Sequence, residues 1–474
     1  MKKSILTVVL MVFLVSAFAQ PGVLDQTFGN NGKVYMPVIP QGYLIYPVDI
    51  KIQPDQKILA LVMMDTAINQ FWYSPADVFF RYQLLRFNPD GTPDSSFGTN
   101  GSTPIVAHER PTNMQLLANG QILLNTAVSN ITTPSFPVLT NVDLCLTRYN
   151  ANGTIDNSFG VNGRAVTPVD TCLSVAISVF VLPNGKIIQA GMSIKYTQVN
   201  PLSYYVLVGY DQNGNIDLSF GNAGKVKVRA KRYMGDYYGV NRFDGFTIPH
   251  SYLMLSNQKI VATADSGLFR FNSNGSLDAS FGTNGFRNYP PAYYASNPPV
   301  TWGLSETPVI AGVVDANDKM VFVMRRASFG GIAPNAFPLV ACRFNPDGSP
   351  DSSFQTFILE RDNTSTPGTN SSKIFLEPNG QYSIAWGRCY SGGYNGSNTQ
   401  LIKLNSDGSA DNSYGKRGRI VSRSDMWGFP FAYRIGMMGN AAALQPDGKM
   451  VVAGIMDTIT FVNNYGTWWQ KAWV

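Results

Sequence analysis

Acidic side chains recur at one position of a repeated motif, and their type and spacing make them the first candidates for chemistry. The motif reads Asp, any residue, Ser or Thr, then an aromatic residue, and it occurs seven times at intervals of 60 to 73 residues. Its acids are Asp25, Asp94, Asp156, Asp217, Asp278, Asp351 and Asp411. An acid at the same place in every repeat is most simply a turn device whose carboxylate accepts backbone N–H groups. We therefore expect these residues to be structural.

A basic residue stands eight positions before the acid in five repeats, so a repeated ion pair is the next interpretation. These residues are Arg86, Arg148, Arg270, Arg343 and Lys403. Gly209 breaks the pattern in another repeat.

Motifs for other chemistry are absent from the sequence. The two histidines, His108 and His250, lie far apart and near no cysteine pair, which argues against zinc. The motif turns lack the later acids of a calcium loop, and there is no nucleophile elbow, phosphate-binding loop or metalloprotease helix. We predict no metal, no cofactor and no catalytic residue. A site assembled from single residues on different repeats would escape such patterns.

Aromatic residues gather between the motif copies and are the candidate binding residues. They are Phe71, Trp72, Tyr73, Tyr293, Tyr294, Trp302, Trp427 and Phe429. Exposed aromatic side chains on rigid loops provide a large contact area for a protein or a glycan at little cost in entropy. The alternative is that they only cap the ends of sheets.

The elements that must position these residues are short strands and tight turns. A glycine precedes each motif acid by three residues, and a second turn, such as Asn184-Gly185-Lys186, lies about midway between motif copies. Asn-Gly and Asp-Gly predict a type I′ hairpin there, with positive φ at both central residues. Apolar runs such as Ile58 to Met64 follow the second turn and indicate buried strands. Seven repeats of about four strands predict an all-β, seven-bladed β-propeller of four-stranded antiparallel blades.

The motif and the second turn resemble those of the delta-60 repeat family of bacterial β-propeller proteins. The resemblance is carried by Asn88-Pro89-Asp90-Gly91 leading to Asp94 and Phe97, by Asn345 to Phe354, and by Leu444 to Lys449. It extends over nearly all of the chain after the N-terminal apolar run. It implies a propeller on an exported protein and no common activity.

The N-terminus predicts export. Residues 1–19 carry Lys2 and Lys3, an apolar run and a small-residue ending, as in a secretory signal peptide, which leaves residues 20–474 as a single propeller domain. The apolar run is shorter than the roughly 20 residues that span a bilayer, so we expect no transmembrane segment in the mature chain. We expect residues 21 to 34 to pack near residues 467 to 474 and so close the ring.

Charge and cysteine usage restrict the partners. The formal net charge of +6 is small for 474 residues and gives no reason to expect nucleic acid. The pairs Cys145 with Cys172 and Cys342 with Cys389 are conceivable disulfides, but buried thiols are the favoured interpretation, because a large propeller needs no covalent staple.

The leading functional hypothesis is a non-enzymatic protein-binding scaffold of the cell envelope, periplasmic, outer-membrane associated or extracellular, with an envelope or outer-membrane protein as partner. One alternative is a carbohydrate-binding protein that uses the aromatic loops. Another is a hydrolase or lyase with its site at the mouth of the propeller channel. Clustered acids with an Arg or His at that mouth would favour the enzyme.

Overall fold

The computed structural model describes the chain in fourteen segments. They are residues 24–35, 43–66, 80–129, 142–169, 173–195, 202–229, 251–264, 267–290, 309–325, 339–360, 371–388, 398–422, 437–462 and 465–473. Every regular element within these segments is a β-strand. None of the described residues belongs to a helix long and apolar enough to cross a bilayer.

The strands follow one another as antiparallel meanders, in which each strand pairs with the next along the chain. The first sheet contains β1 (Tyr43–Ile52), β2 (Ile58–Thr66), β3 (Arg81–Phe87) and β4 (Val106–Ala107). An eight-stranded sheet contains β5 (Glu109–Leu116), β6 (Ile122–Ser129), β7 (Val142–Tyr149), β8 (Arg164–Thr167), β9 (Leu173–Val181), β10 (Ile187–Lys195), β11 (Leu202–Tyr210) and β12 (Lys225–Arg229). It consists of two meanders, β5–β8 and β9–β12, joined by a single parallel pairing of Val142 with Leu173.

Four further sheets complete the described structure. They contain β13 (Tyr252–Met254), β14 (Ile260–Thr263), β15 (Gly267–Phe271) and β16 (Phe286–Asn288); β17 (Val309–Val314), β18 (Met320–Arg325), β19 (Leu339–Phe344) and β20 (Phe357–Glu360); β21 (Ser371–Leu376), β22 (Tyr382–Arg388), β23 (Asn398–Leu404) and β24 (Arg419–Ser422); and the three strands β25 (Met437–Leu444), β26 (Met450–Val462) and β27 (Tyr465–Trp473).

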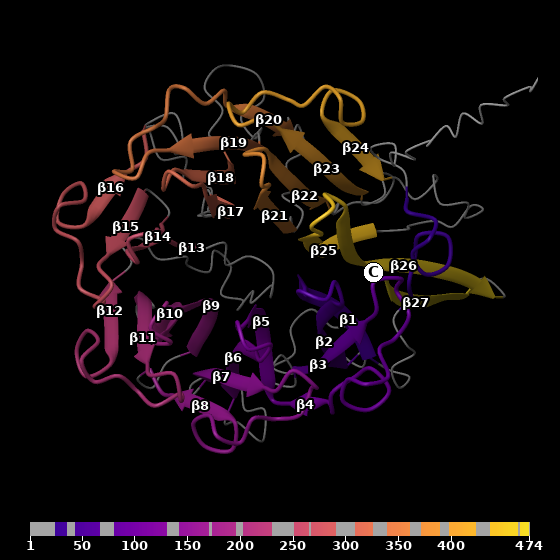
Figure 1. Cartoon of the computed structure of the whole chain (residues 1–474), viewed down its shortest axis with the longest axis horizontal. Helices are drawn as coiled ribbons and strands as arrows, with labels where there is room; N and C mark the ends of the chain where they lie inside the picture. Colours follow the sequence, from indigo (N-terminus) through magenta and orange to yellow (C-terminus); the bar gives the residue numbers. More distant parts are fainter. Residues whose placement is uncertain are drawn as a thin grey trace, which may run out of the picture.

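The meanders stand around a common axis, as in a β-propeller (Figure 1). The first strand of each meander lies innermost, and these strands, β1, β5, β9, β13, β17, β21 and β25, contact one another in that order around the axis. Strand β25 also contacts β1, so the last meander meets the first. The prediction of an all-β fold of the propeller type is confirmed.

The second turns differ from the predicted type I′ hairpin. In the turn that follows β1, Gln56 donates its N–H to the carbonyl of Gln53 at 2.8 Å, and Gln56 has a φ of 64°. Only this one residue of the turn is left-handed, and Gly120 and Gly185 hold the same place in later turns with φ of 82° and 81°. The geometry is a type I turn followed by a left-handed residue, a common three-residue hairpin connection. The type I′ prediction was wrong because the hairpin loop is one residue longer than Asn-Gly alone suggests.

The core lies between neighbouring sheets, where the motif aromatic residue meets a glycine of the next turn. Phe97 is fully buried, and a Cβ atom on Gly153 would lie 2.9 Å from its Cζ atom. Gly153 also has a φ of 86°, so glycine is needed for two reasons. The same approach of a turn glycine to the preceding aromatic ring recurs at Gly214, Gly275, Gly348 and Gly408.

The first motif copy joins the two ends of the ring. Asp25 forms an ion pair with Lys449 of the last meander at 2.7 Å, and the N–H of Gly29 donates to the carbonyl of Asp90, between β3 and β4 of the first meander, at 2.6 Å. Phe28 and Val34 pack on a core cluster shared by β1–β3, β25 and β26. Residues 25–34 therefore bridge the first and last meanders, and we call them the closing segment.

Candidate functional site

Each motif aspartate lies at a turn, where one carboxylate oxygen caps the residues that follow. Asp94 accepts the N–H of Ser96 at 3.1 Å and its hydroxyl at 2.7 Å, both through Oδ1. The same pair of contacts, from a Ser or Thr two residues later, occurs at Asp25, Asp156, Asp217, Asp278, Asp351 and Asp411.

The second carboxylate oxygen meets the arginine eight residues earlier, and that arginine also reaches the next sheet. Arg86 places Nε 2.6 Å from Asp94 Oδ2, and another of its nitrogens donates to the carbonyl of Ala151 at 2.6 Å. The guanidinium stands 4.5 Å from the centroid of the Phe97 ring. We call this arrangement the arginine clamp; it recurs at Arg148, Arg270 and Arg343.

A long side chain from the second turn also contacts the carboxylate of each motif aspartate. The sequence reasoning missed this contact. The Lys or Gln nitrogen of this side chain lies between 2.6 and 3.1 Å from the second carboxylate oxygen. The pairs are Lys57 with Asp94, Gln121 with Asp156, Lys186 with Asp217, Lys259 with Asp278, Lys319 with Asp351, Gln381 with Asp411 and Lys449 with Asp25. The signal was present, because a Lys or Gln ends the second turn in every repeat.

These contacts favour the ionised carboxylates. Hydrogen bonds from Lys449 and Thr27 lower the pKa of Asp25 to about 2. Hydrogen bonds from Lys186 and Ser219 lower the pKa of Asp217. Burial raises the pKa of Asp94, but the hydrogen bonds from Ser96 and Lys57 outweigh it, so the net direction is again downward.

The stability of the protein should therefore fall in acid. A carboxylate whose folded-state pKa is lowered stabilises the fold above its ordinary pKa of 3.8, and this contribution is lost as the pH falls through the folded-state value. We expect the free energy of unfolding, measured by urea titration, to decrease steadily from pH 5 to pH 2. The variant Asp217→Asn should be less stable than the wild type at pH 5. The free energy of unfolding of this variant should also depend less steeply on pH, with a slope smaller by up to about 1.4 kcal/mol per pH unit. An unchanged slope would contradict this assignment.

The predicted aromatic binding residues lie outside the described residues. This applies to Phe71, Trp72, Tyr73, Tyr293, Tyr294, Trp302, Trp427 and Phe429. The described strands beside them are β2 and β3, β16 and β17, and β24 and β25. Their role as binding residues stays a prediction.

The innermost strands bring together residues that the sequence reasoning did not single out. The residue eight positions before the Lys or Gln of each second turn lies on or beside an inner strand. We call these residues the axial layer: Asp49, Asn113, Ser178, Ser251, Ala311, Lys373 and Ala441. Five of the seven carry a polar or charged group beside the axis.

Asp49 is the centre of the charged part of this layer. It is 2% exposed, and its carboxylate accepts the N–H groups of Ile50 and of Met114 on β5, each at 3.1 Å. Two ammonium groups approach it, Lys51 at 3.3 Å and Lys373 at 3.8 Å. Lys373 belongs to β21 and reaches Asp49 past the intervening strand β25, whose residue in the layer is the small Ala441.

This cluster carries a net positive charge that faces water. The Lys51 and Lys373 side chains are 37% and 38% exposed, whereas the single carboxylate between them is buried and already bonded to two backbone N–H groups. One negative charge cannot neutralise two positive ones, so the cluster can attract a further anion. We call Asp49, Lys51 and Lys373 the axial cluster and take it as the candidate functional site.

A second buried carboxylate has a structural explanation. Glu109 is 1% exposed, pairs with Arg164 and accepts the Thr126 hydroxyl at 3.1 Å, and burial raises its pKa. Arg164 follows the last glycine of its motif, as Lys225 and Arg419 do in theirs. Those two residues reach backbone carbonyls of the preceding sheet, at Pro168 and Leu359. Arg164 instead pairs with the Glu109 side chain and so ties the last strand of its own meander to the first.

The described cysteines are buried. Cys145 forms no disulfide, and burial raises the pKa of its thiol to about 11. The pairing with Cys172 considered from the sequence is therefore not formed. Cys342 is buried with its sulfur 3.1 Å from that of Met324. Across the described part of the chain, no three His, Cys, Asp or Glu residues group in a way that could hold a metal ion.

Four segments of the chain match a family model described as "Domain of unknown function (DUF5122) beta-propeller". They are residues 76–97, 135–159, 259–281 and 339–354. The last residue of each segment is the aromatic residue of a motif copy. These matches support a β-propeller family. No curated protein matches the sequence.

Solved structures similar to this chain include several carbohydrate-active enzymes. The polysaccharide lyase Uly1 is 9% identical, with 96% of each chain covered and a TM-score of 0.41. The GH93 α-L-arabinofuranosidase of Fusarium graminearum is 10% identical, with 94% of this chain and 98% of that one covered and a TM-score of 0.38. The endo-arabinase of Bacteroides thetaiotaomicron is 8% identical, with 74% and 91% covered and a TM-score of 0.28.

The comparison corrects the leading functional hypothesis. A non-enzymatic protein-binding scaffold was expected, whereas these similar structures are a lyase and glycoside hydrolases. The expectations of a scaffold and of a protein without enzymatic activity are therefore withdrawn. At such identities and TM-scores no substrate or residue role is transferred to this chain.

Proposed function

We propose that the chain acts on an acidic polysaccharide, as a lyase or hydrolase whose site is the axial cluster. The observation that carries the proposal is the convergence of Lys51 and Lys373, from two non-adjacent meanders, on the single buried carboxylate of Asp49. A carboxylate of the substrate would supply the negative charge that this cluster lacks. The cluster lies beside the propeller axis, where loops of several meanders can hold a polymer.

Elimination fits the cluster better than hydrolysis. In the elimination, a base takes the proton from C5 of a uronate, the electrons form the C4–C5 double bond, the C4–O4 bond breaks and O4 receives a proton. The carboxylate beside C5 must be partly neutralised for that proton to leave, and ammonium groups do this. Glycoside hydrolysis instead needs a pair of carboxyl groups, roughly 5 to 9.5 Å apart. The contacts of the axial cluster include only one carboxyl group, that of Asp49.

We also propose the finer architecture and the location. Seven motif copies, each completed by a second-turn Lys or Gln, and seven inner strands in cyclic contact support seven blades. The motif sequence supports membership of the delta-60 repeat family. Residues 1–19 support export, with residues 20–474 as the propeller domain. The aromatic segments around Trp72, Tyr294 and Trp427 would contribute glycan contacts.

The test is an activity screen with matched variants. The chain from residue 20 is incubated with polygalacturonate, alginate and hyaluronan, and with neutral arabinan and xylan, while the ultraviolet absorbance of the unsaturated product and the reducing ends are followed. We expect turnover of an acidic polymer and a fall in kcat/KM of about 100-fold or more in Lys373→Met and Lys51→Met. Lys195→Met, which removes a lysine at the end of β10, should retain full activity.

Each remaining outcome has a definite meaning. New reducing ends without the unsaturated product would assign hydrolysis instead of elimination. Binding without turnover would favour the carbohydrate-binding alternative. Neither turnover nor binding of any acidic polymer, with the chain folded as judged by its urea midpoint, would refute the proposal.

A further inference from the structure

At the outer rim, some junctions between neighbouring sheets carry a basic side chain and others do not. After the last glycine of the motif, four copies carry a Lys or Arg: Lys33, Arg164, Lys225 and Arg419. Lys225 and Arg419 reach across to the preceding meander, at Pro168 after β8 and at Leu359 on β20. Arg164 pairs instead with Glu109 at the start of β5, within its own meander. In the β13–β16 meander the corresponding residue is Phe286, which has no charged group to make this bridge.

A recess of about 560 Å³ lies where that bridge is missing. It is lined by Phe269, Gly282, Thr283, Asn284, Phe286, Arg287 and Asn288. Phe269 and Phe286 belong to the core cluster between β9–β12 and β13–β16, on which Val226 and Val228 of β12 also pack. The recess thus opens at the junction of these two meanders, and its volume is within the roughly 300 to 1,000 Å³ of small-molecule sites.

The floor of the recess is apolar and fixed. Phe269 and Phe286 are 4% and 5% exposed as residues, and the centroids of their rings lie 4.6 Å apart. The neighbouring turn is closed by paired backbone hydrogen bonds between Thr283 and Phe286 at 2.8 and 3.2 Å. A ligand would therefore meet an ordered surface, so binding would lose little conformational entropy of the protein.

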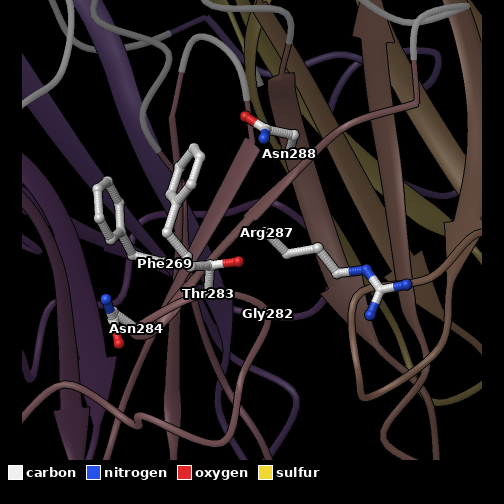
Figure 2. Close-up of a pocket in the computed structure, with 7 residues that line it drawn as sticks. Phe269, Gly282, Thr283, Asn284, Arg287 and Asn288 are labelled. Carbon is white, nitrogen blue, oxygen red and sulfur yellow. The ribbon is translucent and has the colours of Figure 1, made fainter.

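The rim of the recess is polar but carries no directed charge. Thr283, Asn284 and Asn288 are exposed and offer one hydroxyl and two carboxamides. Figure 2 shows Asn284 and Asn288 on either side of Phe269, whereas the Arg287 side chain points away from the Phe269 ring. The Arg287 guanidinium contacts Asp347, between β19 and β20 of the next meander, with the charged atoms 3.5 Å apart.

We propose that this recess binds a neutral sugar unit and is a second carbohydrate site, separate from the axial cluster. A sugar ring presents apolar C–H groups on its faces and hydroxyl groups around its edge. The phenyl edges match the former, and the hydroxyl and carboxamide groups match the latter, because carboxamides both donate and accept hydrogen bonds. A charged ligand would find no opposite charge directed at it.

The test compares two double variants at corresponding positions of two meanders. Asn284→Gly with Asn288→Ala removes both carboxamides and keeps the left-handed backbone of residue 284, whose φ is 52°. The matched control is Asn162→Gly with Val166→Ala, at the corresponding positions in the β5–β8 meander, where Arg164 replaces Phe286. All four side chains are exposed, so both variants should fold.

Binding is measured by calorimetry and saturation-transfer NMR with xylohexaose, cellohexaose, mannohexaose and arabinohexaose, and with a galacturonate hexamer. We expect at least one neutral hexamer to bind, with its affinity lowered about tenfold or more in the recess variant and unchanged in the control. Lys373→Met should leave this binding intact, which separates the recess from the proposed axial site. No binding of a neutral hexamer, equal loss in both variants, or binding of the acidic hexamer alone would overturn the proposal.

Discussion

Replacing Arg343 with methionine is expected to lower the free energy of unfolding by about 3 to 5 kcal/mol. Arg343 holds Asp351 at 2.6 Å and donates to the carbonyl of Ser406 in the next turn at 2.7 Å. Its side chain is 9% exposed and that of Asp351 is 6% exposed. Without the guanidinium, a buried carboxylate keeps only one cation, Lys319 at 2.8 Å, and the inter-sheet hydrogen bond is lost.

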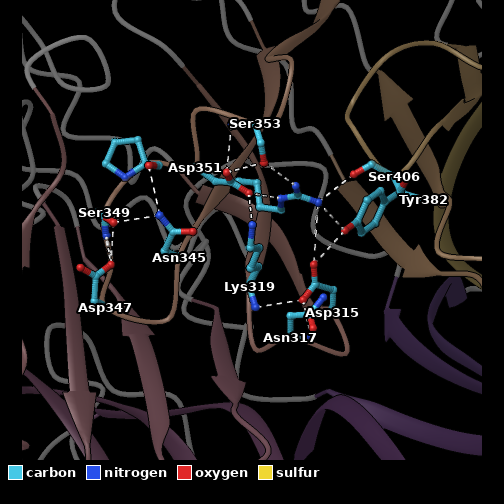
Figure 3. Close-up of polar contacts among 12 residues, drawn as sticks. Asp315, Asn317, Lys319, Asn345, Asp347, Ser349, Asp351, Ser353, Tyr382 and Ser406 are labelled. Carbon is cyan, nitrogen blue, oxygen red and sulfur yellow. Dashed lines mark hydrogen bonds and ion pairs between the residues drawn. The ribbon is translucent and has the colours of Figure 1, made fainter.

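The surroundings of this clamp make its loss more costly than that of the other clamps. Figure 3 shows Asp351, Ser406, Tyr382 and Asp315 gathered in one network. The Asp315 carboxylate lies 3.8 Å from the Arg343 guanidinium and accepts the Tyr382 hydroxyl at 3.3 Å. Removing the arginine therefore leaves two neighbouring carboxylates, which repel each other.

Lys403→Met is the matched control for this variant. Lys403 holds the same motif position in the following repeat, but it pairs with Glu377 at 2.9 Å and is 19% exposed. Its loss should cost about 1 kcal/mol. Urea denaturation of both variants at pH 7 measures the difference, and equal losses would show that the inter-sheet clamp adds nothing to the ion pair.

Removing the closing segment is the second change with a large expected effect. A chain that begins at residue 36 should unfold at a markedly lower urea concentration than one that begins at residue 20, with a loss of roughly 4 kcal/mol. The loss comes from the contacts of Phe28 and Val34 with the shared core cluster, from the hydrogen bond of Gly29 to Asp90, and from the ion pair of Asp25 with Lys449.

Two controls separate closure from a simple loss of charge. Lys449→Met removes the ion pair with Asp25, whose side chains are 44% and 32% exposed, and a second exposed pair with Asp447, so it should cost about 1 kcal/mol or less. A synthetic peptide of residues 20–35, added to the shortened chain, should restore much of the urea midpoint. Equal stability of the two chain lengths would disprove the role of the segment.

Much of the fold was predictable because the repeat encodes it locally. The Asp, Ser or Thr and aromatic residues of the motif lie within four positions of one another, so their capping contacts are formed by neighbours in sequence. The ion pair of Arg86 with Asp94 also follows from a fixed spacing along one strand and turn. The hairpin type was missed because a dipeptide fixes only two of the residues that determine the loop length.

The axial cluster was not predicted from the sequence, since its residues come from distant repeats. Asp49 and Lys373 are ordinary residues in their local sequences, and only the ring brings them together. Aligning the repeats on the second turn would have placed both in one layer, together with the small Ala441 between them. The aromatic candidates were chosen for their residue type alone, and no periodic signal positions them.

The closing segment makes the ring a head-to-tail contact within a single chain. The surface that receives Asp25 and Phe28 is formed jointly by the first and last meanders, so it is incomplete until the whole chain has been made. The same surface can accept the closing segment of a second molecule equally well. Since nothing in such a contact enforces a pair, exchange between chains would continue from one molecule to the next and give open polymers. We therefore expect refolding at high protein concentration to produce long swapped chains, which dilution before refolding would prevent.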